Sequence, residues 1–405
     1  MNNLTISIIY SIERLIRAAS GFIVSIILTR TMGIEAYGEY AYILAIINIF
    51  SVLFSFGLDE FLVREVALNK KIPNFILFSR FLLSFFCFLI ISLVIYLKES
   101  NIFTLLIFTA ISYLWNTFYL MIITEKKKEN LKIIILIILS SLFFILIKYI
   151  SLFYDIHYFI ITTILESFIL LAITYSKIKT KFEKTIFQVD NFIKIIKLSL
   201  PIGASSFSII LFYKIDQLLV EHFYGSRELG IYALSSSIVI ATGFIQSSYI
   251  STCYSDVARN INDNLKLSEA LKNSYRGVFY LGLVIYFSYL TIGQLFLKVI
   301  FPSNYAELNS LLMISLLSII FSGISAINSQ YLFLIGNSNK RLLRTSIALL
   351  FNIIWNYIAL PTMGIKGAAL GFLLTQILIS IIMNIIDKKT FFLFKIQIKS
   401  IIHWR

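Results

Sequence analysis

Three charged residues stand together in an apolar run near the N-terminus: Glu13, Arg14 and Arg17. On a helix, Arg17 would lie ~40° from Glu13 and Arg14 ~100° from it. Glu13 and Arg17 can therefore form a neutral i,i+4 pair, which is one interpretation of the cluster. Such a pair would leave Arg14 without a counter-charge on this helix. Because a guanidinium donates two parallel hydrogen bonds to a phosphate, the other interpretation makes Arg14 and Arg17 candidates for holding a phosphate group of a substrate.

A second charged group, Lys214, Asp216 and Glu221, lies in a later apolar run. By the helical count Lys214, Gln217 and Glu221 share a face, whereas Asp216 points ~160° away from Lys214. Residues i and i+2 do not pair, so Lys214 and Asp216 each need a partner on another helix or in water. We predict Lys214 as a further cation for an anionic substrate. One arrangement has Lys214 facing a cavity and Asp216 tied to a neighbouring helix, but which of them faces inward stays open.

Glu166 stands alone near the middle of another apolar run. A carboxylate inside a bilayer is costly, so it either takes up a coupling proton or sodium ion or is hydrogen-bonded within the protein. The same two alternatives, ion coupling or a structural ion pair, apply to Glu13 and Asp216.

Uncharged polar residues recur at helical spacing in two further runs, with Asn48 and Ser51 in the first and Gln246 in the second. These runs occupy equivalent places in the two halves of the chain. Such residues either pack helix against helix or form the wet wall of a cavity.

The elements that position these residues are membrane helices. The chain is 59% hydrophobic and 14% charged, with a mean hydropathy of +0.87, whereas soluble domains are about 45–50% apolar and about 25% charged. A spanning helix needs about 20 mostly apolar residues. The sequence predicts an all-α membrane protein with twelve transmembrane helices, over residues 6–31, 38–57, 75–97, 102–124, 132–153, 156–176, 200–223, 230–252, 277–301, 308–335, 343–360 and 364–386.

The charge distribution predicts the orientation of these helices. Most of the 35 Lys and Arg residues fall in alternate loops, and such loops are cytoplasmic in membrane proteins. We therefore expect a multi-pass protein of the bacterial inner membrane with both termini in the cytoplasm. The net charge of +14 then reflects these loops rather than nucleic-acid binding. All four prolines are expected at or near helix boundaries, because helix interiors disfavour proline.

An internal repeat divides the chain into two halves. The stretch TRTMGIEAYGEYAYILAI (29–46) resembles EHFYGSRELGIYALSSSI (221–238), with Gly33, Gly38, Tyr40 and Ala41 matched at a separation of 192 residues. The glycines permit a tight turn with positive φ. We predict a six-helix lobe at 1–176, a basic linker at 177–199, a second six-helix lobe at 200–386 and a basic cytoplasmic tail at 387–405.

Several patches, in order along nearly the whole chain, resemble one family. LTRTMGIEAYGEYAYILAI with FGLDEFLVREVA (56–67), and KIDQLLVEHFYGSRELGIYALSSSI with GNSNKRLLRTSIALLFNIIWNYIALPTMGIKGAALGFLLTQ (336–376), are similar to the polysaccharide-export flippases. These belong to the multidrug/oligosaccharidyl-lipid/polysaccharide exporter superfamily and include the Wzx-type O-antigen flippases. The resemblance implies two lobes around a cavity that opens alternately to each side, and an undecaprenyl-diphosphate-linked oligosaccharide as cargo. Polymerase and chain-length proteins are expected partners.

Three alternatives remain beside this interpretation. A polysaccharide polymerase or membrane glycosyltransferase should carry catalytic groups on a large external loop, and the predicted external loops are short. We expect no enzyme activity, no cofactor and no metal site. A multidrug–cation antiporter of the same superfamily shares the architecture, but cationic drugs favour acidic and aromatic cavities. A flippase for the cell-wall lipid precursor usually has more than twelve helices.

Overall fold

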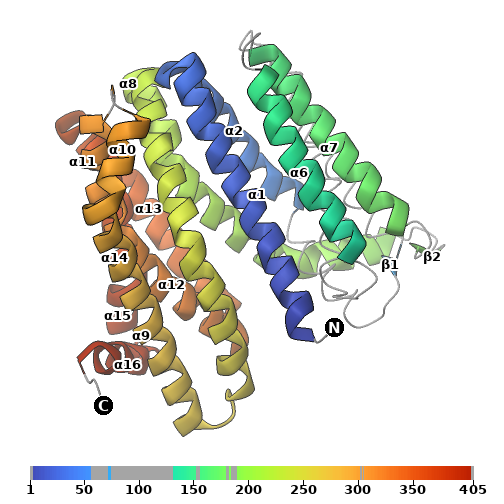
Figure 1. Cartoon of the computed structure of the whole chain (residues 1–405). Coiled ribbons are helices and arrows are strands. Elements are labelled where there is room, and N and C mark those ends of the chain that lie inside the picture. The colour runs from blue at the N-terminus through green and yellow to red at the C-terminus, as the bar shows by residue number, and fades with distance from the viewer. Residues whose placement is uncertain are drawn as a thin grey trace. The chain divides into compact units, whose positions relative to one another are not determined.

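The computed structural model describes residues 3–55, 72–73, 131–151, 156–178, 182–183, 189–301, 303 and 305–402. These residues are almost entirely helical (Figure 1), in agreement with the predicted all-α class. A short parallel pair of strands, β1 (Ile72–Pro73) and β2 (Phe182–Glu183), accompanies the helices. The predicted helices at 75–97 and 102–124 lie outside the described residues.

The chain forms two compact units, one of residues 1–31 with 46–210 and one of residues 32–45 with 211–405. The first unit contains most of α1 (Asn3–Met32) and the later part of α2 (Ile34–Ser55). It also contains α6 (Leu131–Ser151) and α7 (Ile156–Ile178), which pack side by side (Figure 1). The predicted division into a lobe that ends at residue 176 and a lobe that begins at residue 200 stays a prediction.

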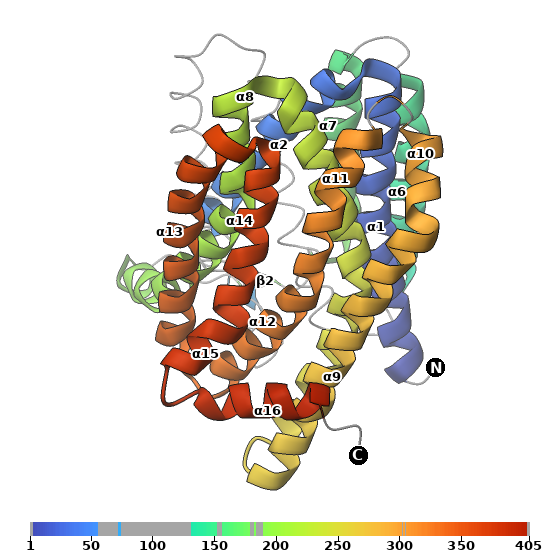
Figure 2. The same ribbon diagram turned by 90° about the vertical axis from the view of Figure 1, so that its left-hand side faces the viewer.

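The second unit begins within the long helix α8 (Val189–Arg259). The further elements are α9 (Asn264–Ser288), the π-helix η3 (Tyr289–Gly293), α10 (Gln294–Ile300), α11 (Tyr305–Ser315), α12 (Leu317–Leu334), α13 (Ser338–Met363), α14 (Ile365–Ile377), the π-helix η4 (Leu378–Ile382), α15 (Met383–Ile386) and α16 (Phe391–Ile402). In this unit α12 packs against α9, and α13 runs beside α14, while α16 crosses the ends of the bundle helices (Figure 2).

In the described part of the chain, six helical stretches are long and apolar enough to cross a membrane. They are 131–151, 203–259, 264–300, 305–334, 339–363 and 365–386. Many large apolar side chains on them are exposed, such as Leu146 at 63% and Val299 at 73%. Lipid is the solvent that suits such a surface, and the protein is a multi-pass membrane protein.

Two boundaries differ from those that the sequence predicts. Pro201 lies inside α8 rather than near a helix end, whereas Pro361 lies close to Met363, where α13 ends, as expected. The segment 253–276, predicted as a loop, is mostly helical, because α8 continues to Arg259 and α9 starts at Asn264. Asp263 caps α9 by accepting hydrogen bonds from the backbone amides of Leu265 and Lys266 at 3.1 and 3.2 Å. Polar sequence therefore extends the helices beyond the apolar spans instead of ending them.

Two of the repeated glycines adopt the backbone conformation that the sequence predicts for them. Gly33 has φ 90° between α1 and α2, and Gly225 has φ 78° within α8. The latter breaks α8 into two arms. These values lie in the region that L side chains avoid, which explains glycine at both positions.

Candidate functional site

Lys214 projects from the first arm of α8 in the second unit. Its Nζ donates a hydrogen bond to Oε1 of Gln217, one turn later, at 3.2 Å. Among the described residues, no carboxylate lies within ion-pair distance of Lys214. The predicted face shared by Lys214 and Gln217 is thus present, and the positive charge on it is not neutralised by the part of the protein described.

Asp216 points to other helices and is 1% exposed. One carboxylate oxygen accepts a hydrogen bond from the Tyr232 hydroxyl, on the second arm of α8, at 3.0 Å. The other accepts one from Nδ2 of Asn356, on α13, at 2.9 Å. The arrangement with Asp216 tied to a neighbouring helix is therefore the one observed. Its partners are neutral, so the hydrogen bonds do not cancel the charge of an ionised carboxylate.

Asn352 and Asn356 complete this polar cluster, and sequence reasoning missed both. Each is fully buried, and Nδ2 of Asn356 also lies 2.9 Å from both side-chain and backbone oxygens of Asn352. Nδ2 of Asn352 and Oδ1 of Asn356 have no hydrogen-bond partner among the described residues. The available signal was the i,i+4 spacing of two amides in an apolar run, which places both on one helix face.

Glu166 is not the isolated carboxylate that we expected. It forms an ion pair with Lys148, which connects α7 to α6 in the first unit. Both side chains are shielded, at 16% and 13% exposure. Lys148 lies in the last turn of α6, from which its long side chain reaches Glu166. A structural ion pair accounts for Glu166.

Glu13 is 1% exposed within α1. Arg14 and Arg17 follow on the same helix, but their side chains lie outside the described part of the structure. The proposed Glu13–Arg17 pair and the headgroup role of the arginines therefore stay predictions.

Gln246 packs helix against helix, which is one of the two arrangements that the sequence leaves open. It is 2% exposed and donates a hydrogen bond from Nε2 to the backbone oxygen of Val278 at 2.8 Å, so it joins α8 to α9. Gly323 on α12 provides the room, because a Cβ there would lie 2.5 Å from the Gln246 amide. Asn48 is half-buried in α2, and the side chain of Ser51 lies outside the described part.

The chain is similar to known proteins in both sequence and fold. The model of a family described as polysaccharide biosynthesis protein matches residues 5–254. No curated protein matches this chain. The structure of an inward-facing multidrug resistance MATE family transporter of the MOP superfamily aligns with a TM-score of 0.68 at 14% identity, covering 96% of this chain and 95% of that one. Lipid II flippase MurJ, in an inward closed conformation, gives 0.66 at 20% identity, with 98% and 91% covered. A Vibrio cholerae MATE transporter gives 0.57 at 13% identity, with 97% and 98% covered.

At these identities the structural likeness shows the fold, which is that of the MATE and MurJ transporters. The family match reaches over more than half of the sequence and includes both α1 and the arm of α8 that carries Lys214. The chain belongs to the polysaccharide biosynthesis protein family.

Proposed function

We propose that this protein translocates an undecaprenyl-diphosphate-linked oligosaccharide, such as an O-antigen or capsule repeat unit, from the cytoplasmic to the outer face of the bacterial inner membrane. Membership of a polysaccharide biosynthesis family supports a glycan cargo. The likeness to a lipid II flippase and to MATE transporters supports alternating access as the mechanism. Polymerase and chain-length proteins are the partners that such cargo would require.

One observation carries the proposal. Lys214 lies in a membrane-spanning helix and has a neutral amide as its hydrogen-bond partner. A charge held in hydrocarbon without a counter-ion marks a substrate pathway more often than a structural role. A diphosphate supplies the missing negative charge, and its oxygens accept hydrogen bonds from an ammonium group. Arg14 and Arg17 are the further cations that we assign to this headgroup.

Asp216 is the coupling-ion candidate in this proposal, because Glu166 is occupied by Lys148. Its hydrogen-bond donors, Tyr232 and Asn356, are neutral and hold the carboxylate in place without neutralising it. A proton or a sodium ion would do so. An Asn at position 216 can keep the bond from Asn356 to its oxygen, while the Tyr232 hydroxyl turns to accept from the new amide. Asp216→Asn should therefore keep both contacts and remove the dependence of transport on the ion gradient.

Flipping of a fluorescent undecaprenyl-diphosphate oligosaccharide in proteoliposomes tests the function. Loss of one charge-assisted contact is worth about 1.5–3 kcal/mol, so Lys214→Gln should slow transport about tenfold or more. Lys214→Arg should retain most of the activity. Lys298→Gln is a matched control, since Lys298 is an exposed basic residue near the end of another span. Equal rates for all variants and the wild type would refute the role of Lys214.

Arg14 and Arg17 are tested in cells that lack their own flippase of this kind. Arg17→Ala should abolish surface polysaccharide and leave the lipid-linked precursor on the cytoplasmic face, with normal amounts of protein in the membrane. Full complementation by both Arg14→Ala and Arg17→Ala would mean that the headgroup assignment is wrong.

Antiport of cationic drugs is the second candidate function, and the MATE structures favour it. Uptake of a fluorescent cation into the same proteoliposomes distinguishes the two. Transport of the cation with no flipping of the lipid-linked sugar would replace the flippase proposal.

A further inference from the structure

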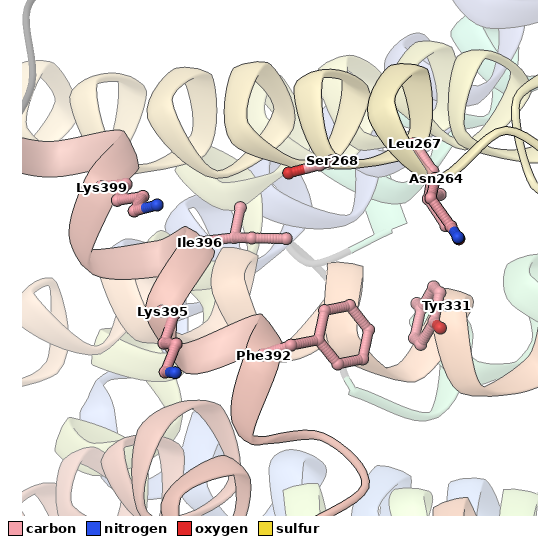
Figure 3. Close-up of a pocket in the computed structure, with 8 residues that line it drawn as sticks. All are labelled: Asn264, Leu267, Ser268, Tyr331, Phe392, Lys395, Ile396 and Lys399. Atoms are coloured by element: carbon pink, nitrogen blue, oxygen red, sulfur yellow. The ribbon is translucent and has the colours of Figure 1, made fainter.

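A pocket of about 460 Å³ opens between α9, α12 and α16 in the second unit (Figure 3). Neither Lys214 nor Asp216 lines this pocket. Asn264 and Ser268 reach it from α9, Tyr331 from α12, and Lys395 and Lys399 from α16. Helices distant in the sequence therefore bring two ammonium groups and three neutral polar groups to one cavity.

The helix α16 is firmly docked rather than a loose basic tail. Leu393 and Ile396 are buried in an apolar cluster formed with α8, α9 and α12. Nε2 of Gln397 donates to Oδ1 of Asn328 at 3.1 Å, and Nε of Arg276 donates to the backbone oxygen of Ser400 at 3.2 Å. The pocket walls are thus fixed parts of the bundle, and a ligand there would meet a preformed site.

The pocket lies close to the ends of three stretches that are long and apolar enough to span a membrane. One membrane-spanning stretch begins at Asn264, another ends at Leu334 close to Tyr331, and a third ends at Ile386, shortly before α16. Phe391, Phe392 and Ile398 on α16 are exposed at 38–40%. An amphipathic helix with exposed aromatic and aliphatic groups beside lysines is suited to the interfacial plane of a bilayer.

The charges in the pocket lack a counter-ion within the described residues. Neither Lys395 nor Lys399 forms an ion pair there, although Nζ of Lys395 lies over the Phe391 ring, 5.3 Å from its centre. The nearby carboxylate of Asp263 is occupied by Lys266, at 3.2 Å, and by two backbone amides. The Tyr331 hydroxyl and the amide of Asn264 add neutral donors.

We propose that this pocket binds the phosphate headgroup of an anionic phospholipid of the bilayer. Lys395 and Lys399 would pair with the phosphate, and Asn264, Ser268 and Tyr331 would hydrogen-bond the polar headgroup. The acyl chains would run along the exposed apolar groups of α16, beside the Tyr331 and Phe392 rings, which pack edge to face with centres 5.8 Å apart. A bound lipid would bridge α16 to the start of α9. Basic residues at this end predict the cytoplasmic leaflet, whose anionic lipids attract such clusters.

Native mass spectrometry of the full chain tests this site. The protein is taken from nanodiscs that contain phosphatidylcholine and phosphatidylglycerol, and retained lipid is counted. The wild type should keep one phosphatidylglycerol. A surface lysine contributes about 1 kcal/mol to binding anionic lipid, so Lys395→Gln with Lys399→Gln should weaken retention about 30-fold. The matched control is Lys388→Gln with Lys389→Gln, which removes the same charge from exposed neighbours that do not line the pocket.

Five outcomes would overturn the proposal. The first three are equal retention by the pocket variant and the wild type, equal loss in the Lys388/Lys389 control, and equal retention of phosphatidylcholine. The fourth is displacement of the lipid by inorganic phosphate alone, which would make the pocket a free-anion site. If added undecaprenyl diphosphate displaced phosphatidylglycerol at far lower concentration, the pocket would belong to the cargo and the phospholipid assignment would fail. None of these outcomes depends on whether the protein transports the proposed cargo.

Discussion

A Cβ atom added to Gly38 on α2 would lie 1.8 Å from the backbone oxygen of Ser226 on α8. The reciprocal contact also exists, since a Cβ on Gly230 would lie 2.1 Å from the backbone oxygen of Ile34. The two contacts are related by the same offset of 192 residues as the sequence repeat. Here two helices cross with backbone against backbone, and only a residue without a side chain fits. Whether the repeat extends over both lobes stays a prediction.

Gly38→Ala should destabilise the protein by about 1–3 kcal/mol or more, because the new methyl group meets rigid backbone rather than a flexible side chain. Gly230→Ala should have a similar effect. Gly243→Ala is the control, since a Cβ there meets nothing within 4 Å and alanine favours the helix. Thermal unfolding in detergent measures all three. Equal melting temperatures would show that the two helices can move apart without cost.

Removing one partner of the Lys148–Glu166 pair should be worse than removing both. Glu166→Gln leaves Lys148 unpaired in an apolar span, at a cost of up to about 3–5 kcal/mol. The double variant with Met at both positions should be close to the wild type in stability and should still transport. A transport defect in a stable double variant would return Glu166 to the coupling scheme.

Acid should weaken the attachment between α13 and the segment that precedes α16. Burial works to raise the pKa of Asp387, but hydrogen bonds from Lys340 and the Lys389 amide, with the charges of Lys340 and Arg344, hold the pKa below its usual value. Because the folded-state pKa is the lower one, this stabilisation is present above the unfolded-state pKa of about 3.9 and is lost as pH falls through the folded-state value.

The wild type should therefore lose stability below about pH 4 more steeply than Asp387→Asn, which is less stable at neutral pH and lacks this titration. Melting temperatures across the acidic range measure the difference. Parallel profiles for the two proteins would contradict the prediction.

Asn328→Leu should release α16. Oδ1 of Asn328 accepts hydrogen bonds from the Tyr275 hydroxyl at 2.6 Å and from Gln397 at 3.1 Å. The Tyr275 hydroxyl would be left buried and unsatisfied, at about 1–3 kcal/mol. Gln397 would lose one of its two hydrogen bonds and keep the other, to the backbone oxygen of Ser380 at 3.2 Å. Limited proteolysis should then cleave near the C-terminus faster than in the wild type. Asn260→Leu, which removes one bond to Asp256 in the same turn, is the control. Equal cleavage in both variants would argue that the apolar cluster alone holds α16.

Composition and helical periodicity predict the fold class well, because an apolar chain in lipid has few ways to form all the hydrogen bonds of its backbone N–H and C=O groups. The same periodicity placed Lys214 and Asp216 on different faces and left the choice of partner open. That choice depends on which helices are neighbours, and Asn356 lies 140 residues further along the chain. A single sequence does not show which helices are neighbours, so it does not identify Asn356 as the partner of Asp216.

The errors have physical reasons. The sequence predicts Glu166 to stand alone because spacing along the chain does not show that the long side chain of Lys148, on another helix, can reach it. The segment 253–276 is predicted to lie outside the helices because it is polar. Helices, however, end where capping and turn residues end them, and here the cap is Asp263.

The break at Gly225 gives the hydrogen bond between Asp216 and Tyr232 a special position. Asp216 lies on one arm of α8 and Tyr232 on the other, so this hydrogen bond connects the two arms across the break. A proton or metal ion bound to the carboxylate would compete with the Tyr232 hydroxyl for the same oxygens. If Asp216 is the coupling residue that we propose, we expect the angle between the two arms to change with its occupancy.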